Sequence, residues 1–237
     1  MEPVVHFRGA VSLLGRFPAL AGVDLDVAPG EVVLLRGPNG AGKTTVLRCC
    51  AALVPVTAGR AVVLGHDLTG PDMTGPALTG PALTGQARRA LRARVGLLGH
   101  ATGLYDELTV ADNVRFWARA NGADRADAEA AMAGLGLDGR LAQVAVGRLS
   151  AGQRRRTALA VMLARRPELW LLDEPHAGLD QAGRGVLDGL IRKGAAAGAT
   201  VLIASHEGER AEAVATRTVD LAGGIVVGDT TGALRAP

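Results

Sequence analysis

The chain has 237 residues, of which 48% are hydrophobic and 21% are charged, and its formal net charge is +3. This composition is typical of a globular protein with a sizeable core. The longest apolar run, Ala158 to Ala164, is bounded by arginines and is too short to span a membrane. Aromatic residues make up only 3% of the chain, which argues against a stacking platform for nucleic acid, so we expect no nucleic-acid partner.

The cysteines and the first residues bear on the compartment. Cys49 and Cys50 are adjacent and are the two cysteines of the sequence, which excludes a disulfide framework and favours a reducing cytoplasm. The first 20 residues lack a basic stretch followed by a long apolar run, so we expect no secretory signal. Arginines cluster at 88–94, 154–156 and 165–166, a pattern that fits bound phosphate or, more commonly, a solvated helix face.

The first part of the chain alternates short apolar runs with turn residues. Strands are predicted at 22–27 and 31–36, and the continuous apolar run within the second is typical of a strand buried on both faces of a parallel sheet. A glycine-rich loop at 37–42 follows, then a helix over 43–53 and a strand over 61–64. Strand, loop and helix in this order indicate an α/β unit.

Residues 69–85 carry a five-residue tandem repeat, TGPDM, TGPAL and TGPAL, followed by TG. Proline at this density cannot continue a helix or lie inside a sheet. We interpret the segment as a low-complexity surface loop, with a docking arm as the less favoured alternative.

The pattern is helical from 106 to 166. Thr109 is predicted to cap a helix through 113–120, an alanine-rich helix covers 123–135, and Ser150 precedes a third helix over 153–165. Apolar strands return at 169–172 and 200–204, joined by a helix over 182–196, and an edge strand is predicted at 225–227. The predicted fold class is α/β, with a mostly parallel core sheet formed by 1–98 and 167–237 and a helical subdomain over 99–166.

The sequence GPNGAGKT at 37–44 matches the P-loop motif G-x-x-x-x-G-K-[ST], and it lies between a predicted strand and a predicted helix, as the motif requires. Backbone N–H groups of such a loop face phosphate oxygens at a helix N-terminus. Lys43 would bring a positive charge to the β and γ phosphates, and the Thr44 hydroxyl would bind Mg²⁺. The expected phosphate-binding residues are Gly37, Pro38, Asn39, Gly40, Ala41, Gly42, Lys43, Thr44 and Thr45.

A second apolar run, 169–172, ends in two carboxylates, Asp173 and Glu174. Asp173 would hold Mg²⁺ through water, and Glu174 would polarise the water that attacks the γ-phosphate. Beside the motif at 37–44, this pair predicts a P-loop NTPase.

Three further segments carry a resemblance to a known family. LSAGQ at 149–153 resembles the signature motif of ATP-binding cassette (ABC) ATPases and precedes Asp173 by one helix, as in that family. AGLD at 177–180 resembles the D-loop, and His206 resembles the switch histidine. With the two phosphate-site motifs, the ordered motifs cover nearly the whole chain, which is therefore similar to an ABC-type nucleotide-binding domain.

The resemblance implies an ATP-hydrolysing transport ATPase that uses ATP and Mg²⁺ and forms a head-to-tail homodimer. Each ATP would be held between residues 37–45 of one subunit and the signature of the other. The implied partner is an integral membrane subunit, which would hold the chain at the cytoplasmic face of the membrane. The implied roles are contact with ATP across the dimer by Ser150, Gly152 and Gln153, communication between the sites by Asp180, and catalysis by Glu174, His206 and Lys43.

Two other classes share such a site. Soluble ABC ATPases of DNA repair or translation carry long insertions or two cassettes, which this chain lacks. A module that binds ATP without hydrolysing it is disfavoured because Thr44, Glu174 and His206 are all present.

His100 is the main departure from the family, which usually carries glutamine at the junction between the core and the helical subdomain. The Gly99-His100 pair and the sequence 98–108 resemble the haem exporter ATPase of cytochrome c maturation, the CcmA family. The implied function is ATP hydrolysis for haem export, with a drug, antibiotic or lipid exporter as the alternative. The docking surface for the membrane subunit is expected around 100–107. The adenine-stacking position falls on Phe17 or, by register, on Leu14.

Overall fold

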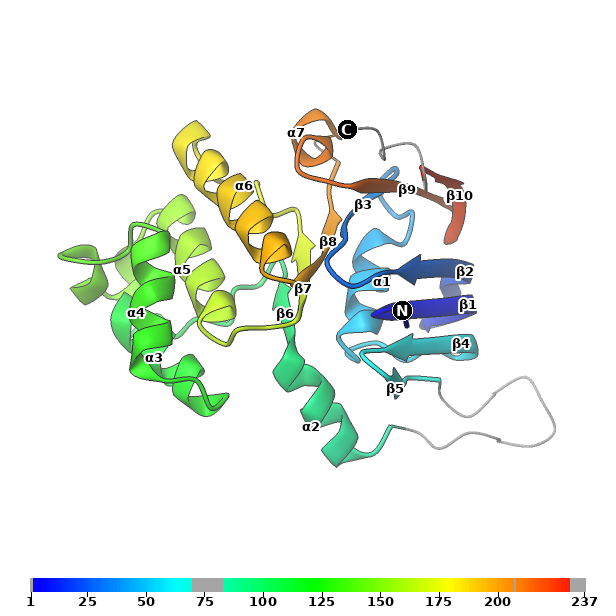
Figure 1. Ribbon diagram of the computed structural model, residues 1–237, viewed down its shortest axis with the longest axis horizontal. Coiled ribbons are helices and arrows are strands. Elements are labelled where there is room, and N and C mark those ends of the chain that lie inside the picture. Colours follow the sequence, from blue (N-terminus) through cyan, green and yellow to red (C-terminus); the bar gives the residue numbers. More distant parts are fainter. Residues whose placement is uncertain (1, 70–82, 207, 231–237) are drawn as a thin grey trace.

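The computed structural model describes residues 2–69, 83–206 and 208–230, which form two sheets and a group of helices (Figure 1). Most of the tandem repeat, residues 70–82, lies outside the described residues. Its last Thr-Gly pair is described: Thr84 caps helix α2 (Gly85–Arg94), so the expected loop ends where this helix begins. Within the described ranges, every helix is too short or too polar to cross a membrane.

The core sheet has six strands and is mostly parallel, as predicted. Each neighbouring pair is parallel except for the two strands at one edge, which are antiparallel. The run 32–35 is buried and lies between two parallel neighbours, as its continuous apolar sequence predicts. From edge to edge the strands are β10 (Ile225–Asp229), β9 (Arg217–Ala222), β3 (Val32–Arg36), β8 (Thr200–Ala204), β7 (Leu169–Asp173) and β6 (Val95–Leu98).

A second, antiparallel sheet packs beside the first and was not predicted as a separate layer. Its order is β2 (Phe17–Val27), β1 (Val5–Leu14), β4 (Ala58–Val63) and β5 (His66–Asp67). The predicted strands at 22–27 and 61–64 coincide with parts of β2 and β4.

Helix α1 (Lys43–Cys50) lies between the two sheets, because it contacts β2 on one side and β7 and β8 on the other. It ends before the predicted position 53, since Ala52 has a left-handed backbone with a φ of 52°. Cys49 and Cys50 are buried in the core that α1 forms with both sheets. Burial raises the pKa of the Cys49 thiol to about 11 and the pKa of the Cys50 thiol well above its ordinary value, which fits their interpretation as small core residues.

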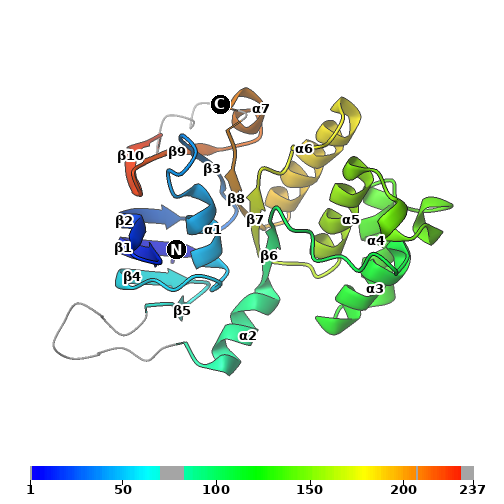
Figure 2. The ribbon, with the colours of Figure 1, turned by 180° about the vertical axis from the view of Figure 1, so that it is seen from behind.

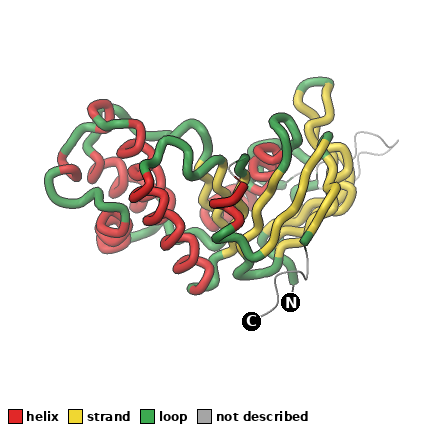
Figure 3. Tube along the Cα trace, turned by 90° about the horizontal axis from the view of Figure 1, so that it is seen from above, coloured by secondary structure: helices red, strands yellow, loops and turns green. Residues whose placement is uncertain are grey.

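The opposite face of the core sheet is covered by helices (Figure 2). Helices α3 (Val110–Ala120), α4 (Arg125–Gly134) and α5 (Ala151–Leu163) pack on one another, and α6 (Gln181–Ala196) lies against β8. Thr109 caps α3 and Ser150 caps α5, as predicted. Most helices therefore gather at one end of the molecule and the strands at the other (Figure 3). A short helix, α7 (Gly208–Glu212), follows β8.

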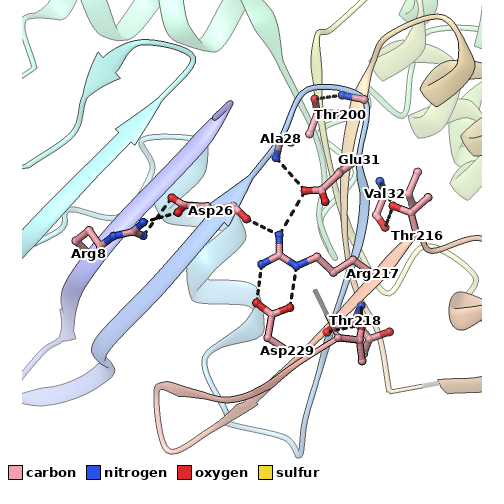
Figure 4. Close-up of polar contacts among 12 residues, drawn as sticks. Arg8, Asp26, Ala28, Glu31, Val32, Thr200, Thr216, Arg217, Thr218 and Asp229 are labelled. Carbon is pink, nitrogen blue, oxygen red and sulfur yellow. Dashed lines mark hydrogen bonds and ion pairs between the residues drawn. The ribbon is translucent and has the colours of Figure 1, made fainter. Parts of the chain in front are cut away.

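The two sheets are joined by a buried arginine, Arg217 of β9 (Figure 4). Its guanidinium donates to both carboxylate oxygens of Asp229 at 2.8 and 2.6 Å and to the Asp26 carbonyl at 2.6 Å. Glu31 lies 3.4 Å from the same guanidinium. Since Asp26 belongs to the antiparallel sheet and Asp229 to the core sheet, one side chain holds both layers together.

Candidate functional site

The glycine-rich loop leaves β3 and enters α1, the arrangement that the motif requires. Two of its glycines have no room for a side chain. A Cβ on Gly37 would lie 2.1 Å from the Leu221 carbonyl oxygen, and one on Gly42 would lie 2.8 Å from the Ala19 carbonyl oxygen. Both have left-handed φ angles, 145° and 105°. The loop therefore passes through a narrow space between the two sheets, and its backbone path requires glycine at both positions.

Lys43 is the first residue of α1 and is buried. Its ammonium group donates to the carbonyl oxygens of Gly37 at 2.7 Å and Pro38 at 3.0 Å. The charge thus lies over the loop, beside backbone N–H groups at the start of α1, where an anion is stabilised by the helix dipole.

A cleft of about 330 Å³ opens over this loop. The structure brings the loop together with the two carboxylates predicted at the end of β7, although more than 120 residues separate them in sequence. Leu14 also lines the cleft, whereas the side chain of Phe17 is 80% exposed and is not among the lining residues. The residues lining it are Leu14, Ala19, Asn39, Gly40, Ala41, Gly42, Lys43, Thr44, Thr45, Asp173 and Glu174.

Thr44 and Asp173 meet in the cleft. The Thr44 hydroxyl lies 3.0 Å from each of the two carboxylate oxygens of Asp173. Hydroxyl, carboxylate and phosphate oxygens are the ligands that Mg²⁺ prefers, so these two side chains fit such an ion.

Glu174 is held at the carboxyl ends of two adjacent strands. Its backbone has a φ of 45°, unusual for a residue other than glycine. The Ser205 hydroxyl donates to one carboxylate oxygen at 3.1 Å, and the His206 backbone N–H donates to the other at 3.0 Å. The His206 ring nitrogen Nδ1 lies 2.8 Å from that second oxygen. The pairing of β7 with β8 brings the two predicted catalytic residues, Glu174 and His206, into direct contact.

A second cleft, of about 340 Å³, lies on the other side of the same carboxylates. Exposed His100 lines this second cleft together with Asp173 and Glu174, and it is not among the residues that line the cleft over the glycine-rich loop. Because Asp173 and Glu174 line both clefts, the two clefts meet at this pair.

Of the signature residues, Ala151 lines the second cleft, whereas Ser150, Gly152 and Gln153 line neither cleft. Ser150 and Gln153 cap α5 reciprocally: the Gln153 N–H donates to the Ser150 hydroxyl at 3.2 Å, and the Ser150 N–H donates to the Gln153 side chain at 2.9 Å. Leu169 and Leu171 of β7 face the core that contains α1, whereas Trp170 and Leu172 face the core that contains α5. The two helices thus cover opposite faces of the sheet.

Consequently the chain does not bring Ser150, Gly152 or Gln153 to its own glycine-rich loop. Asp180 also lies outside that cleft and caps α6, since its carboxylate accepts from the Gly183 N–H at 2.8 Å. Gly152 approaches the D-loop: a Cβ on it would lie 3.1 Å from the Gly178 carbonyl oxygen.

Arg155 was not among the predicted site residues, because the arginines at 154–156 were interpreted as a solvated helix face. Arg155 is only 9% exposed and donates to the carbonyl oxygens of Asp173 and Glu174. Burial lowers its pKa from the ordinary arginine value, against the attraction of the two carboxylates. The available signal was helical spacing, because Arg155 precedes Leu159 by four residues and Met162 by seven on the apolar face of α5.

A buried histidine was also missed. His176 is 1% exposed, and its Nε2 lies 2.7 Å from Asp188 of α6, which in turn accepts from Arg210 of α7 at 3.1 Å. The chain segments that follow Glu174 and His206 are linked through this group.

Comparisons with known proteins agree with the geometry. The family model described as ABC transporter matches residues 20–177. The cytochrome c biogenesis ATP-binding export protein CcmA of Bradyrhizobium diazoefficiens is 37% identical over 84% of this chain and 90% of its own length. The CcmA protein of Bordetella bronchiseptica is 37% identical over 93% of this chain and 92% of its own length.

Among solved structures, the dimeric ATP-binding cassette MJ0796 in a post-hydrolysis state, bound to ADP and Pi, superposes with a TM-score of 0.83. It is 25% identical, over 98% of this chain and all of that one. The expected ABC cassette fold and the resemblance to the CcmA family are thereby confirmed. This chain belongs to the ABC transporter family, as an ATP-binding subunit that hydrolyses ATP.

Proposed function

We propose that this chain drives an exporter that serves cytochrome c biogenesis, with haem as the exported molecule. The supporting observation is the similarity to CcmA proteins of two organisms, at 37% identity over 84% and 93% of this chain. The Gly99-His100 junction, which carries the resemblance in the sequence, lines the cleft beside the paired carboxylates.

Hydrolysis is assigned to residues of the first cleft. Lys43 and the loop N–H groups would bind the phosphates of ATP, and Thr44 and Asp173 would hold Mg²⁺, which would supply positive charge to the phosphates. Glu174 accepts a proton from the attacking water, and His206 orients the Glu174 carboxylate through the 2.8 Å contact. We also assign contact with the γ-phosphate to His206, because its ring lies beside Glu174, which lines the cleft.

The complete site needs a second copy of the chain. Ser150, Gly152 and Gln153 lie at the exposed start of α5, on the face of the sheet opposite to α1. A head-to-tail homodimer would place this helix N-terminus, with its free N–H groups, on ATP held by the partner subunit. Asp180, at the start of α6, would lie beside the same interface.

The helical subdomain, residues 99–166, carries the surface that we assign to the membrane subunit. A groove of about 150 Å³ between β6 and α5 is lined by Leu98, Thr102 and Trp117. Trp117 belongs to an aromatic cluster in which the Tyr105 and Phe116 rings lie 5.5 Å apart edge to face, and both are nearly half exposed. In a chain with 3% aromatic residues, such a cluster favours an apolar partner.

This docking would hold the chain at the cytoplasmic face of the membrane through its partner alone. The tests of the transported substrate therefore need the whole transporter in a cell, whereas the tests of hydrolysis need only the chain itself.

The deciding experiment is a haem-stained gel of covalent c-type cytochromes from the native host. In this host the Glu174→Gln variant replaces the wild-type chain. Selective loss of the stained bands is expected, because export would stop with ATP hydrolysis. Glu168→Gln is the matched control, since it makes the same change at the other end of β7, in an exposed pair with Arg94. Unchanged bands with Glu174→Gln, in a host shown to make these cytochromes, would contradict the proposal and favour a drug, antibiotic or lipid exporter.

A further inference from the structure

Arg155 places a positive charge inside the protein, which requires an explanation. The side chain is only 9% exposed, and its neighbours on the inner face of α5 are apolar. An arginine stays protonated even when burial lowers its pKa, so the charge must be offset by nearby polar groups. Nothing in the packing of α5 itself provides these groups, because its backbone carbonyls are used within the helix.

The charge is offset by the carboxylates of the catalytic pair and by three backbone carbonyls beside them. Nη1 of Arg155 donates to the Gly99 oxygen at 2.7 Å, and Nη2 donates to the oxygens of Asp173 at 2.7 Å and Glu174 at 2.8 Å. The pairing of β6 with β7 ends at Leu98 and Leu172, so these carbonyls lie just beyond the last rung of the ladder. The guanidinium bridges the two strands where the ladder ends.

We propose that Arg155 is a positioning residue for ATP hydrolysis, which fixes the backbone that carries Asp173 and Glu174. The inference rests on the catalytic roles proposed for these two carboxylates. Glu174 has a left-handed φ of 45°, a conformation that persists only where surrounding contacts hold it. Arg155 bonds the carbonyl of that same residue, while Ser205 and His206 hold its carboxylate from the other side.

The position of Arg155 on α5 adds a second consequence. The same helix is capped by Ser150, the residue assigned to the ATP of the partner subunit. Arg155 lies little more than one turn further along the helix. Gly99, the third acceptor, immediately precedes His100 at the junction with the helical subdomain. Movement of this subdomain relative to the core sheet would therefore be transmitted to the backbone of Glu174 by one side chain.

A positioning role and a purely structural role predict different kinetics. Arg155 is not among the residues that line the cleft over the glycine-rich loop, and the phosphates are assigned to that loop and Lys43, so we expect loss of Arg155 to change KM little. A displaced general base slows the chemical step, and misplacement by about 1 Å costs about 100-fold in rate. Loss of a structural contact alone would lower the unfolding temperature and leave the turnover of the folded protein unchanged.

The test compares Arg155→Met, Arg155→Lys and Arg156→Met in the full chain, with kcat and KM for ATP and the unfolding temperature measured for each. Arg156→Met is the matched control, because Arg156 is the next residue of α5 and also bonds a carbonyl, that of Leu135 at 3.1 Å, away from the site. We expect Arg155→Met to lower kcat by about 10- to 100-fold with KM within about twofold. Arg155→Lys should recover part of this loss, since an ammonium group can reach some of the carbonyls. Arg156→Met should keep kcat within about twofold.

Unchanged kcat in folded Arg155→Lys and Arg155→Met would overturn the proposal. A fall in kcat/KM that comes entirely from a higher KM would also overturn it. Where Arg155→Met does not fold, Arg155→Gln takes its place and is judged by the same criteria, because its amide carries no charge and cannot bridge all three carbonyls. Glu174→Gln is measured in the same assay. Normal turnover of Glu174→Gln would show that the proposed role of Glu174 is wrong, and the result for Arg155 would then be assessed separately.

Discussion

At the scale of single residues, Glu174 is held by neighbours at both its carboxylate and its backbone carbonyl. Its carboxylate accepts from Ser205 and from the backbone of His206, and these contacts aim it into the first cleft. We expect Glu174→Gln to bind ATP as the parent does and to hydrolyse it about 10² to 10⁴ times more slowly, since an amide cannot accept the proton. Equilibrium ATP binding and steady-state ATPase rates check this, and near-normal turnover would contradict the assignment.

Leu14 is the residue to which we assign the contact with the adenine base. It lines the cleft, whereas Phe17 projects into solvent with 80% of its surface exposed. We expect Leu14→Tyr to tighten ATP binding several-fold, because an aromatic ring adds about 1 kcal/mol of stacking. Phe17→Leu should leave the affinity unchanged. The opposite pattern in a nucleotide titration, with Phe17→Leu weakening ATP, would assign base stacking to Phe17.

A residue of the site could be predicted from the sequence when the pattern that identifies it lies within a few neighbouring residues. Lys43 and Thr44 were predicted because the P-loop motif is a single run of sequence, and Asp173 because it ends an apolar strand. Arg155 was missed because its acceptors lie 18, 19 and 56 residues away and form only when β6, β7 and α5 pack together. A run of three arginines indicates a solvated surface unless helical spacing is considered.

At the scale of elements, α5 connects the two halves of the proposed dimer site. We expect Ser150→Arg to abolish hydrolysis, because a bulky cation would block the helix N-terminus that faces the partner's ATP. ATP binding by the isolated subunit should be unchanged, since Ser150 does not line the chain's own cleft. Thr84→Arg is the matched control: it removes the N-cap of α2, at a similar cost of about 1 kcal/mol, away from both clefts.

Mixing Ser150→Arg with Lys43→Ala subunits tests the arrangement across the dimer. In a mixed dimer one of the two sites has an intact loop and an intact signature, so partial activity should return. If mixed dimers demonstrably form and remain inactive, the proposed contact between one subunit's signature and the other's ATP is wrong.

Elements with a regular pattern were predicted well. The helix that begins after Thr109 combines a cap with a steady apolar period, and β8 is a run of five buried residues whose limits the prediction matched. By contrast, β1 was missed because its pairing register shifts after Phe7, after Ala10 and after Ser12. Such bulges interrupt the two-residue alternation by which an amphipathic strand is identified.

At the scale of the whole molecule, stability depends on Arg217 at the junction of the two sheets. We expect Arg217→Met to lower the free energy of unfolding by about 2 kcal/mol, because it removes the bonds of a buried guanidinium to Asp229 and to the Asp26 carbonyl. Urea unfolding measures the change.

Arg36→Met is the control for this prediction. Arg36 also bonds two carboxylates, Glu212 and Asp220, but its side chain is 45% exposed. Exposed ion pairs contribute less than about 1 kcal/mol, so the loss should be smaller. Equal losses for the two variants would mean that burial of Arg217 adds nothing to the junction.

The pairing of β3 has a consequence for biosynthesis. Its neighbours β8 and β9 come from the last part of the chain: Gly30 bonds Thr200 across 170 residues, and Val32 bonds Thr216 across 184. A ribosome adds about 5 to 20 residues per second, so the apolar run 32–35 emerges roughly 10 to 30 s before either neighbour exists. During this interval the nascent chain exposes an apolar segment of the future core without its strand partners, which makes it a natural client for chaperones that bind extended apolar peptide.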